Sequence, residues 1–161
     1  MSYARFAAMI AVSTVVMFGL MYLNTYAVEH VRFSETRAFM ALIMGATMAA
    51  IMLLFMLKMY PDRRVNTAIL AGAAVVFAGA LTLVRSQQTV GDVAFMKAMI
   101  PHHSIAIMTS ERAQIRDPRV RKLADEIIEA QRREIAEMNA LIADLERSPP
   151  PRGAPVLAPS T

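Results

Sequence analysis

Three long apolar stretches fill the first half of the chain, and two amphipathic stretches follow them. The apolar stretches run from Phe6 to Tyr26, from Ala38 to Tyr60 and from Thr67 to Val84. Each has roughly the 20 mainly apolar residues that a helix needs to cross a bilayer. The charged residues Arg5, Lys58 and Arg85 lie at the ends of these stretches, where long side chains reach the polar interface. The pattern predicts three transmembrane helices within residues 1–90.

The basic residues that flank the three stretches predict an orientation. The N-terminus and the second loop share one side, which carries Arg5, Lys58, Arg63 and Arg64. Because cytoplasmic loops are enriched in Lys and Arg, we expect this side to be cytoplasmic. The first span is longer than the apolar part of a secretory signal, so we expect an uncleaved anchor. The chain is then predicted to contact lipid in the cell inner (plasma) membrane, with everything after Arg85 on the periplasmic or extracellular side.

The two amphipathic stretches predict an antiparallel helical hairpin over residues 91–147. Asp92 can cap a first helix that ends near Ile115, and Asp117-Pro118 provides a cap followed by proline at the first helical position. A short connection makes the two helices antiparallel neighbours. The residues expected on the buried face of the second helix are Ala124, Ile127, Gln131, Glu134, Met138, Leu141, Ile142 and Leu145.

The remaining residues, 148–161, are rich in proline and are expected to be disordered. The predicted fold class is therefore all-α, with three transmembrane helices followed by a hairpin. A hairpin of this size is close to the limit at which one core supports itself. We therefore expect a homodimer or higher homo-oligomer that completes a four-helix bundle.

Composition and charge exclude several classes of function. Hydrophobic residues make up 56% of the chain, which favours insertion into a membrane. The formal net charge is +4, but residues 92–147 contain nine Lys or Arg against ten Asp or Glu. No basic patch is left there to bind nucleic acid. Cysteine is absent from the sequence, so neither a disulfide framework nor a thiolate metal site is expected.

The segment Met99-Ile100-Pro101-His102-His103 carries the candidate chemistry. Met96, Met99 and His103 follow the spacing of one helix face, and a kink at Pro101 is expected to bring His102 toward them. Imidazole and thioether together favour copper, above all Cu(I). The facing helix adds Gln131, Glu134 and Met138. A second interpretation stays open, in which the methionines fill core gaps and the polar residues hydrogen-bond one another within an oligomerising hairpin.

These residues also carry a family resemblance. The segments Phe95-Met96, Met99 to His103, Ala106-Ile107-Met108, Leu123-Ala124, Ile127-Ile128, Gln131, Glu134-Ile135 and Met138 resemble the signature of the domain-of-unknown-function 305 family. The resemblance implies a ferritin-like bundle, exported or membrane-tethered, in which several members bind copper through His and Met. It implies as metal ligands Met96, Met99, His102, His103, Met108 and Met138, with Gln131 and Glu134 in supporting roles.

The chain departs from that family in two places. It has one copy of the motif where many relatives have two, and Ser104 stands where relatives often have Gln. A catalytic function is not expected, because di-iron proteins use Glu-x-x-His pairs. Here Met99 and Ile100 occupy the positions three residues before His102 and His103.

The second span contains a repeated methionine. Met40, Met44, Met48, Met52 and Met56 follow one another at four-residue steps. One interpretation is flexible apolar packing between the spans. The other is a path of thioethers that passes Cu(I) along the membrane. The remaining histidine, His30, is expected on the surface of the first exterior loop.

Overall fold

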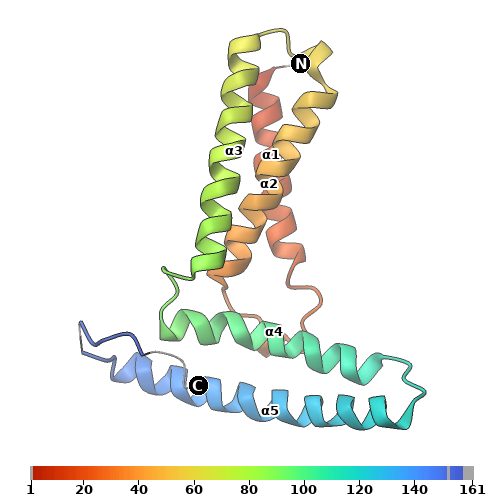
Figure 1. Ribbon diagram of the computed structural model, residues 1–161, viewed down its shortest axis with the longest axis vertical. Coiled ribbons are helices and arrows are strands. Elements are labelled where there is room, and N and C mark those ends of the chain that lie inside the picture. Colours follow the sequence, from red (N-terminus) through yellow and green to blue (C-terminus); the bar gives the residue numbers. More distant parts are fainter. Residues whose placement is uncertain (1, 152, 158–161) are drawn as a thin grey trace.

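The computed structural model describes residues 2–151 and 153–157, and its ordered elements in that part of the chain are all helical (Figure 1). The α-helices are α1 (Tyr3–Leu20), α2 (Glu35–Phe55), α3 (Arg63–Ser86), α4 (Asp92–Arg112) and α5 (Pro118–Arg147). Two short 3₁₀ turns, η1 (Val28–His30) and η2 (Leu57–Met59), lie in the first two loops. The all-α fold class predicted from the sequence is confirmed.

The first three helices are each long and apolar enough to cross a membrane. They form a bundle, called here the three-helix bundle, with α2 in contact with both α1 and α3 (Figure 1). Polar side chains accept from free backbone amides at each start: Ser2 in α1, Ser34 in α2 and Asp62 in α3. Side chains therefore define where these helices begin.

The first helix is shorter than the predicted span. It ends at Leu20, whereas the apolar stretch continues to Tyr26. Residues 21–24 form turns after the helix, and the backbone amide of Tyr26 then donates to Ser104 Oγ at 2.8 Å. An apolar run alone does not show where the chain turns away from the helix axis.

Close contacts hold the three-helix bundle together. Phe6, Leu53 and Tyr60 form its buried cluster at the end distant from α4. Midway along α2, Gly45 faces Thr14 of α1 so closely that a Cβ at Gly45 would collide with the Thr14 side chain. Small residues let two helix backbones approach in this way. The packing of α1 on α2 therefore depends on Gly45.

The hairpin consists of α4 and α5, which run antiparallel and lie across one end of the three-helix bundle (Figure 1). Asp117 caps α5 by accepting from the Arg119 amide, and Pro118 is its first residue, as predicted. The first helix of the hairpin ends at Arg112, three residues before the expected end at Ile115. It continues without interruption through Pro101.

The core of the hairpin is a narrow seam between its two helices. Its buried residues are Met96, Ile100, Ile107, Ile135 and Ile142. The predicted buried stripe on α5 is rotated slightly away from this seam. Ile135 is buried but lies outside the predicted stripe, whereas Leu141 belongs to the stripe and is 46% exposed. The α5 stripe is wider than the seam that two helices can bury, and its unburied edge faces an open cavity instead.

A hydrogen-bonded contact joins the hairpin to the first loop. Ser104 of α4 is fully buried, and its hydroxyl oxygen accepts from the Tyr26 amide and lies 2.9 Å from His30 Nδ1. The Tyr26 ring packs against the hairpin core. His30 is therefore a half-buried contact residue and not the surface residue expected from the sequence.

After α5 the described residues 148–151 and 153–157 carry no helix. The disorder predicted for residues 148–161 also covers 152 and 158–161, which lie outside the described residues.

Candidate metal centre

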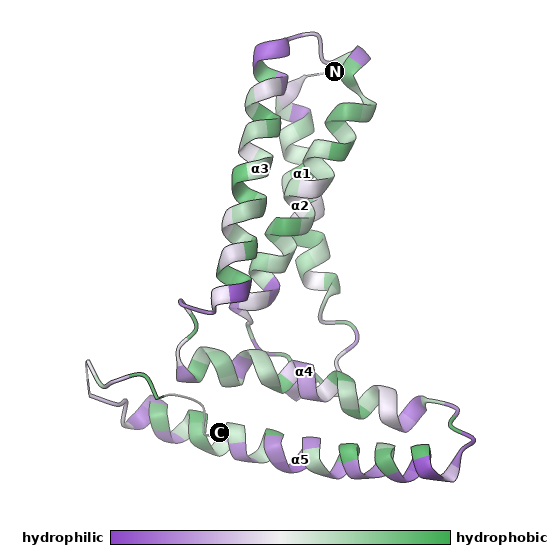
Figure 2. Ribbon diagram, in the orientation of Figure 1, coloured by the Kyte–Doolittle hydropathy of each residue, from purple (hydrophilic) through white to green (hydrophobic). Residues whose placement is uncertain are grey.

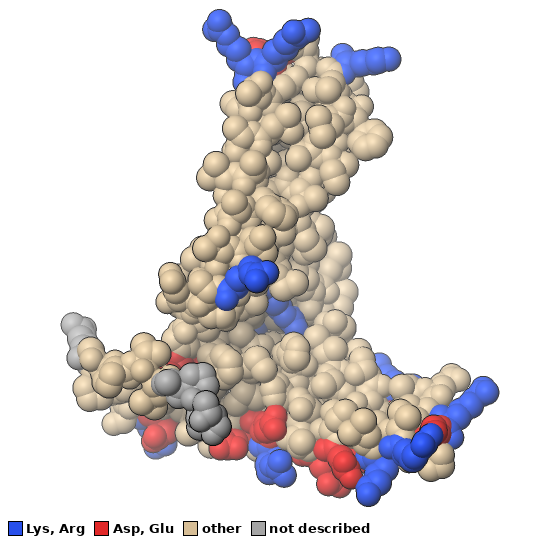
Figure 3. Space-filling view, viewed as in Figure 1, with Lys and Arg blue, Asp and Glu red and all other residues tan. Residues whose placement is uncertain are grey.

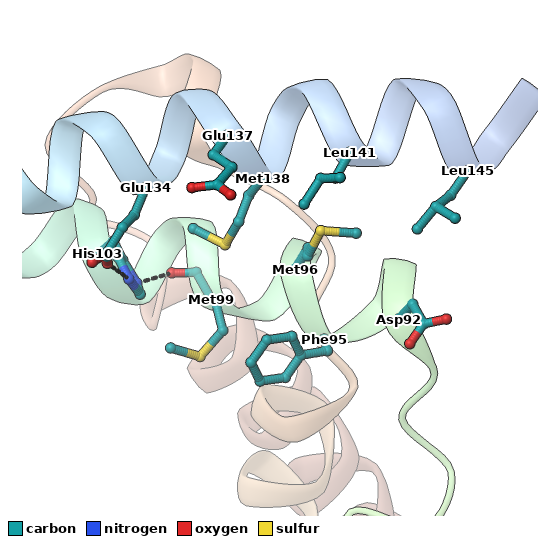
Figure 4. A pocket seen from close by; sticks show the side chains of 10 residues that line it. All are labelled: Asp92, Phe95, Met96, Met99, His103, Glu134, Glu137, Met138, Leu141 and Leu145. Atoms are coloured by element: carbon teal, nitrogen blue, oxygen red, sulfur yellow. Dashed lines mark hydrogen bonds and ion pairs between the residues drawn. The ribbon is translucent and has the colours of Figure 1, made fainter. Parts of the chain in front are cut away.

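A cavity of about 560 Å³ lies between α4 and α5 on one side of their seam. This space, called here the hairpin cavity, is shown in Figure 4. It is lined by Asp92, Phe95, Met96, Met99, His103, Glu134, Glu137, Met138, Leu141 and Leu145. Apolar side chains dominate one end, and the single imidazole and the Glu134 carboxylate meet at the other. Such a cavity is mostly apolar and partly shielded from water, and it presents a few polar atoms to a ligand.

His103 is held at both ring nitrogens. Its Nδ1 lies 2.9 Å from the backbone oxygen of Met99, one turn earlier in α4, and its Nε2 lies 2.7 Å from Glu134 Oε2 on α5. A carbonyl oxygen only accepts, so Nδ1 donates. The side chain of His103 is 12% exposed and that of Glu134 is 42% exposed. The imidazole is thus fixed in orientation, with Nε2 directed toward α5.

This arrangement places a proton between the two helices. Both hydrogen bonds are satisfied only when a proton lies between Nε2 and the Glu134 carboxylate, because Nδ1 already donates its own proton elsewhere. When that proton leaves, Nε2 presents a lone pair to the cavity while Nδ1 still donates to Met99. Histidine ligands of metals are oriented by the same kind of second hydrogen bond.

Three thioethers line the same cavity as His103. Met96 is 6% exposed and belongs to the hairpin core, and Met138 packs on that core from α5. The Met99 side chain leaves α4 on the side away from α5 (Figure 4). One imidazole nitrogen and three thioethers are a donor set that suits Cu(I) better than hard cations.

Other predicted ligands do not join this cavity. His102 is exposed and lines a different cavity, between α4 and the three-helix bundle. Its ring centre lies 6.1 Å from that of His103, with the ring planes at 65°. Met108 and Gln131 are half-buried and do not line the hairpin cavity. Consecutive helical residues point about 100° apart, and the predicted convergence of both imidazoles on Met99 in one pocket is not found.

The methionine repeat of α2 also lies apart from the hairpin cavity. Met44, Met48 and Met52 line a separate space of about 340 Å³ along α2, together with Thr47 and Ile51. Both interpretations of the repeat, as packing and as a path for Cu(I), stay predictions.

Within residues 2–151 and 153–157, no group of three His, Cys, Asp or Glu side chains is gathered as a metal site. The donors at the hairpin cavity are instead mixed: one imidazole, the thioethers, and the carboxylates of Asp92, Glu134 and Glu137.

The sequence reasoning missed two of these carboxylates and the role of Ser104. Glu137 of α5 lines the cavity beside Met138. Its spacing of three residues from Glu134 was the available signal. Asp92 is expected to cap α4, but the N-cap is Gly91 without a side-chain hydrogen bond, and Asp92 is the first residue of the helix. No local pattern marks Ser104, because its partners come from a loop more than 70 residues earlier.

The comparisons with known proteins agree with the resemblance seen in the motif. Residues 82–155 match the family described as "Domain of unknown function (DUF305)". The predicted resemblance to this family is confirmed. The matched segment covers α4 and α5, including the whole hairpin cavity, and leaves most of the three-helix bundle outside.

A curated relative also matches. It is "Uncharacterized protein L153" of Acanthamoeba polyphaga mimivirus, 41% identical over 61 residues. The matched segment covers 37% of this chain and 40% of the relative, so the chain spans well under half of the relative's length. No solved structure matches.

Proposed function

We propose that this chain is a membrane-tethered protein that binds Cu(I) in the hairpin cavity and so captures or buffers copper. The ligands would be His103 Nε2 and the thioethers of Met96, Met99 and Met138. The observation that carries the proposal is the fixed His103 ring, whose Nδ1 donates to Met99 while Nε2 faces a methionine-lined cavity. On binding, Cu(I) takes the place of the proton shared with Glu134, and that proton is released.

The carboxylates around the cavity support a cation as the ligand. The Glu134 carboxylate lies 2.7 Å from Nε2, and Asp92 and Glu137 add negative charge at the rim. A single positive charge placed among them is favoured electrostatically. The soft donors favour copper over magnesium or calcium, which prefer oxygen ligands. We propose binding without catalysis, since no Glu-x-x-His pair accompanies His102 or His103.

The arrangement of charges supports a membrane location with the N-terminus in the cytoplasm. Exposed Arg5, Lys58, Arg63 and Arg64 lie at the end of the three-helix bundle that is distant from the hairpin, and Figure 3 shows basic side chains gathered there. The body of the bundle is free of charged side chains over most of its visible surface. By the positive-inside tendency, the hairpin then lies on the periplasmic or extracellular side of the plasma membrane.

The proposal is tested by titrating the full-length protein in detergent with Cu(I) against a chromophoric Cu(I) chelator, without oxygen. We expect binding at low micromolar affinity or tighter, and loss of the tightest site in His103→Ala. Thr109→Ala is the matched control, because Thr109 is exposed on the same helix and bonds only to its own turn. Wild-type protein that never competes with the chelator, or His103→Ala protein that binds as tightly as wild type, would overturn the proposal.

A second function is favoured by the openness of the hairpin. Phe95 is 53% exposed and Leu141 46% exposed, both at the cavity. A second hairpin could cover them and complete a four-helix bundle, as expected for a metal-independent module that joins copies of this chain. Light scattering of the detergent-solubilised protein distinguishes the Cu(I)-binding function from the interaction module. A dimer that is unchanged by Cu(I) and lost in Leu141→Glu favours the interaction module.

A further inference from the structure

A second cavity lies next to the hairpin cavity around α4, between this helix and the three-helix bundle. Its volume is about 390 Å³, and we call it the junction cavity. Among its lining residues are Met21 from the end of α1, Met40 from the first turns of α2, and Met99 and His102 from α4. Soft donors from three helices, distant in sequence, therefore meet at one place.

His102 and Met99 reach the junction cavity because of where they lie on α4. His102 is turned about 100° around the helix from His103, so the two imidazoles line two neighbouring cavities. Met99 lines both cavities, and its side chain leaves α4 on the side away from α5 (Figure 4). Met99 is thus shared between the hairpin cavity and the junction cavity.

We propose that the junction cavity is a second Cu(I) site, formed by the His102 imidazole and the thioethers of Met21 and Met40, with Met99 shared with the first site. This inference rests on the proposed function, because it assumes that the chain handles Cu(I). It gives His102 a role that the hairpin cavity does not, and it recruits two methionines that lie outside the matched family segment.

The two sites differ in their surrounding charge. Arg37 also lines the junction cavity. Its guanidinium is already engaged, since Nη1 donates to the Met21 oxygen at 2.7 Å and the group lies 4.3 Å from the centre of the Tyr22 ring. Its positive charge nevertheless opposes a nearby cation, whereas carboxylates surround the hairpin cavity. The junction site therefore binds Cu(I) more weakly than the hairpin site.

The junction site also lies at the start of the methionine repeat of α2. Met40 begins the methionine repeat of α2 and lies one turn before Met44, which lines the next cavity along that helix. A cuprous ion in the junction cavity is thus located between the hairpin site and the apolar helices. This position suits exchange of the ion between the hairpin site and the junction site, which share Met99 as a ligand.

The test is an anaerobic Cu(I) titration of the full-length protein in detergent against a chromophoric Cu(I) chelator. Wild-type protein is expected to take up two equivalents in two steps. Met21→Leu/Met40→Leu is expected to keep only the tighter step, since leucine retains the volume and removes the sulfur. Met44→Leu/Met48→Leu is the matched control on the same helix, outside the junction cavity, and keeps both steps.

A further variant guards against a folding defect in the double mutant. His102→Gln changes an exposed side chain, so it preserves packing and is also expected to lose the weaker step. One equivalent in wild type, or two in both junction variants, overturns the junction site and leaves the proposed function standing. Wild-type protein that binds no Cu(I) overturns both proposals.

Discussion

The three-helix bundle and the hairpin bury their side chains in different ways. In the most apolar windows of α1, α2 and α3, only 6%, 28% and 6% of residues are buried by the protein itself. Figure 2 shows these helices hydrophobic on most of their surface, whereas α5 alternates hydrophobic and hydrophilic positions. The bundle leaves most of its apolar surface uncovered by the protein, as is compatible with a membrane protein, whereas the hairpin buries its apolar side chains in one seam.

In the three-helix bundle and in the hairpin, different sequence signals are informative. In the bundle, apolar length indicates a helix but not which face contacts another helix. In the hairpin, the three-and-four spacing indicates the seam and therefore the residues beside it. The candidate chemistry lies in the hairpin and at its boundary with the bundle, where both signals overlap.

The largest expected effect is on copper binding by the hairpin. Replacing the two thioethers of the seam, Met96→Leu with Met138→Leu, should weaken Cu(I) binding at the tighter site by at least about tenfold. Leucine fills a similar volume, so the fold should persist. Chelator competition measures the affinity, and circular dichroism checks the helix content.

Met108→Leu is the control for this change. Met108 lies on the same helix but does not line the hairpin cavity, so its replacement should leave the affinity as in wild type. Equal weakening in both proteins would show that sulfur at the seam does not bind the metal specifically.

The next effect concerns the bundle alone. Gly45→Leu places a side chain against Thr14 and should lower the free energy of unfolding by about 2–3 kcal/mol, the upper part of the range for overpacking. The tighter copper site should keep its affinity, because the hairpin does not contact Gly45. Thermal unfolding in detergent and the copper titration give the two readouts.

Gly72→Leu provides the comparison within the bundle. A side chain at Gly72 meets no atom within 4 Å, so this variant should unfold at nearly the wild-type temperature. If both glycine variants were equally destabilised, close contact with Thr14 would not be the cause.

The contact between the two regions gives a smaller effect. Ser104→Ala leaves the Tyr26 amide without its partner in a partly buried position, which costs about 1–2 kcal/mol. Hydrogen exchange at the Tyr26 amide should accelerate while exchange within α5 stays slow. Thr109→Ala, which removes an exposed hydroxyl, should change neither; unchanged exchange at Tyr26 in Ser104→Ala would mean that the loop is held by other contacts.

Much of this architecture follows from the sequence for identifiable reasons. Asp117-Pro118 sets the start of α5 locally, so the cap was predictable. The contact of the first loop with Ser104 is tertiary, and no local pattern reveals it. Ile135 was missed because a stripe wider than the seam does not indicate which edge is buried. His103 was placed beside Met96 by spacing, whereas grouping His102 with them relied on an expected kink, and α4 runs unbroken through Pro101.

The smallest effect concerns the cap of α5 and depends on pH. Hydrogen bonds from the Arg119 side chain, and then from its backbone amide, lower the pKa of Asp117. A carboxyl whose pKa is lower in the folded protein stabilises it above the unfolded value, about pH 4, and this stabilisation is lost as pH falls through the folded value. Asp117→Asn keeps a capping oxygen but removes the charge.

The Asp117→Asn variant should therefore unfold at a slightly lower temperature than wild type above pH 4, and the difference should shrink toward zero on acidification. Because the Arg119 side chain is exposed and the Asp117 side chain is partly exposed, added salt should also reduce the difference. Thermal unfolding of both proteins across this pH range, at low and high salt, checks the prediction. A difference that grows at low pH would mean that the charge of Asp117 destabilises the cap, contrary to the geometry of its two bonds with the Arg119 guanidinium.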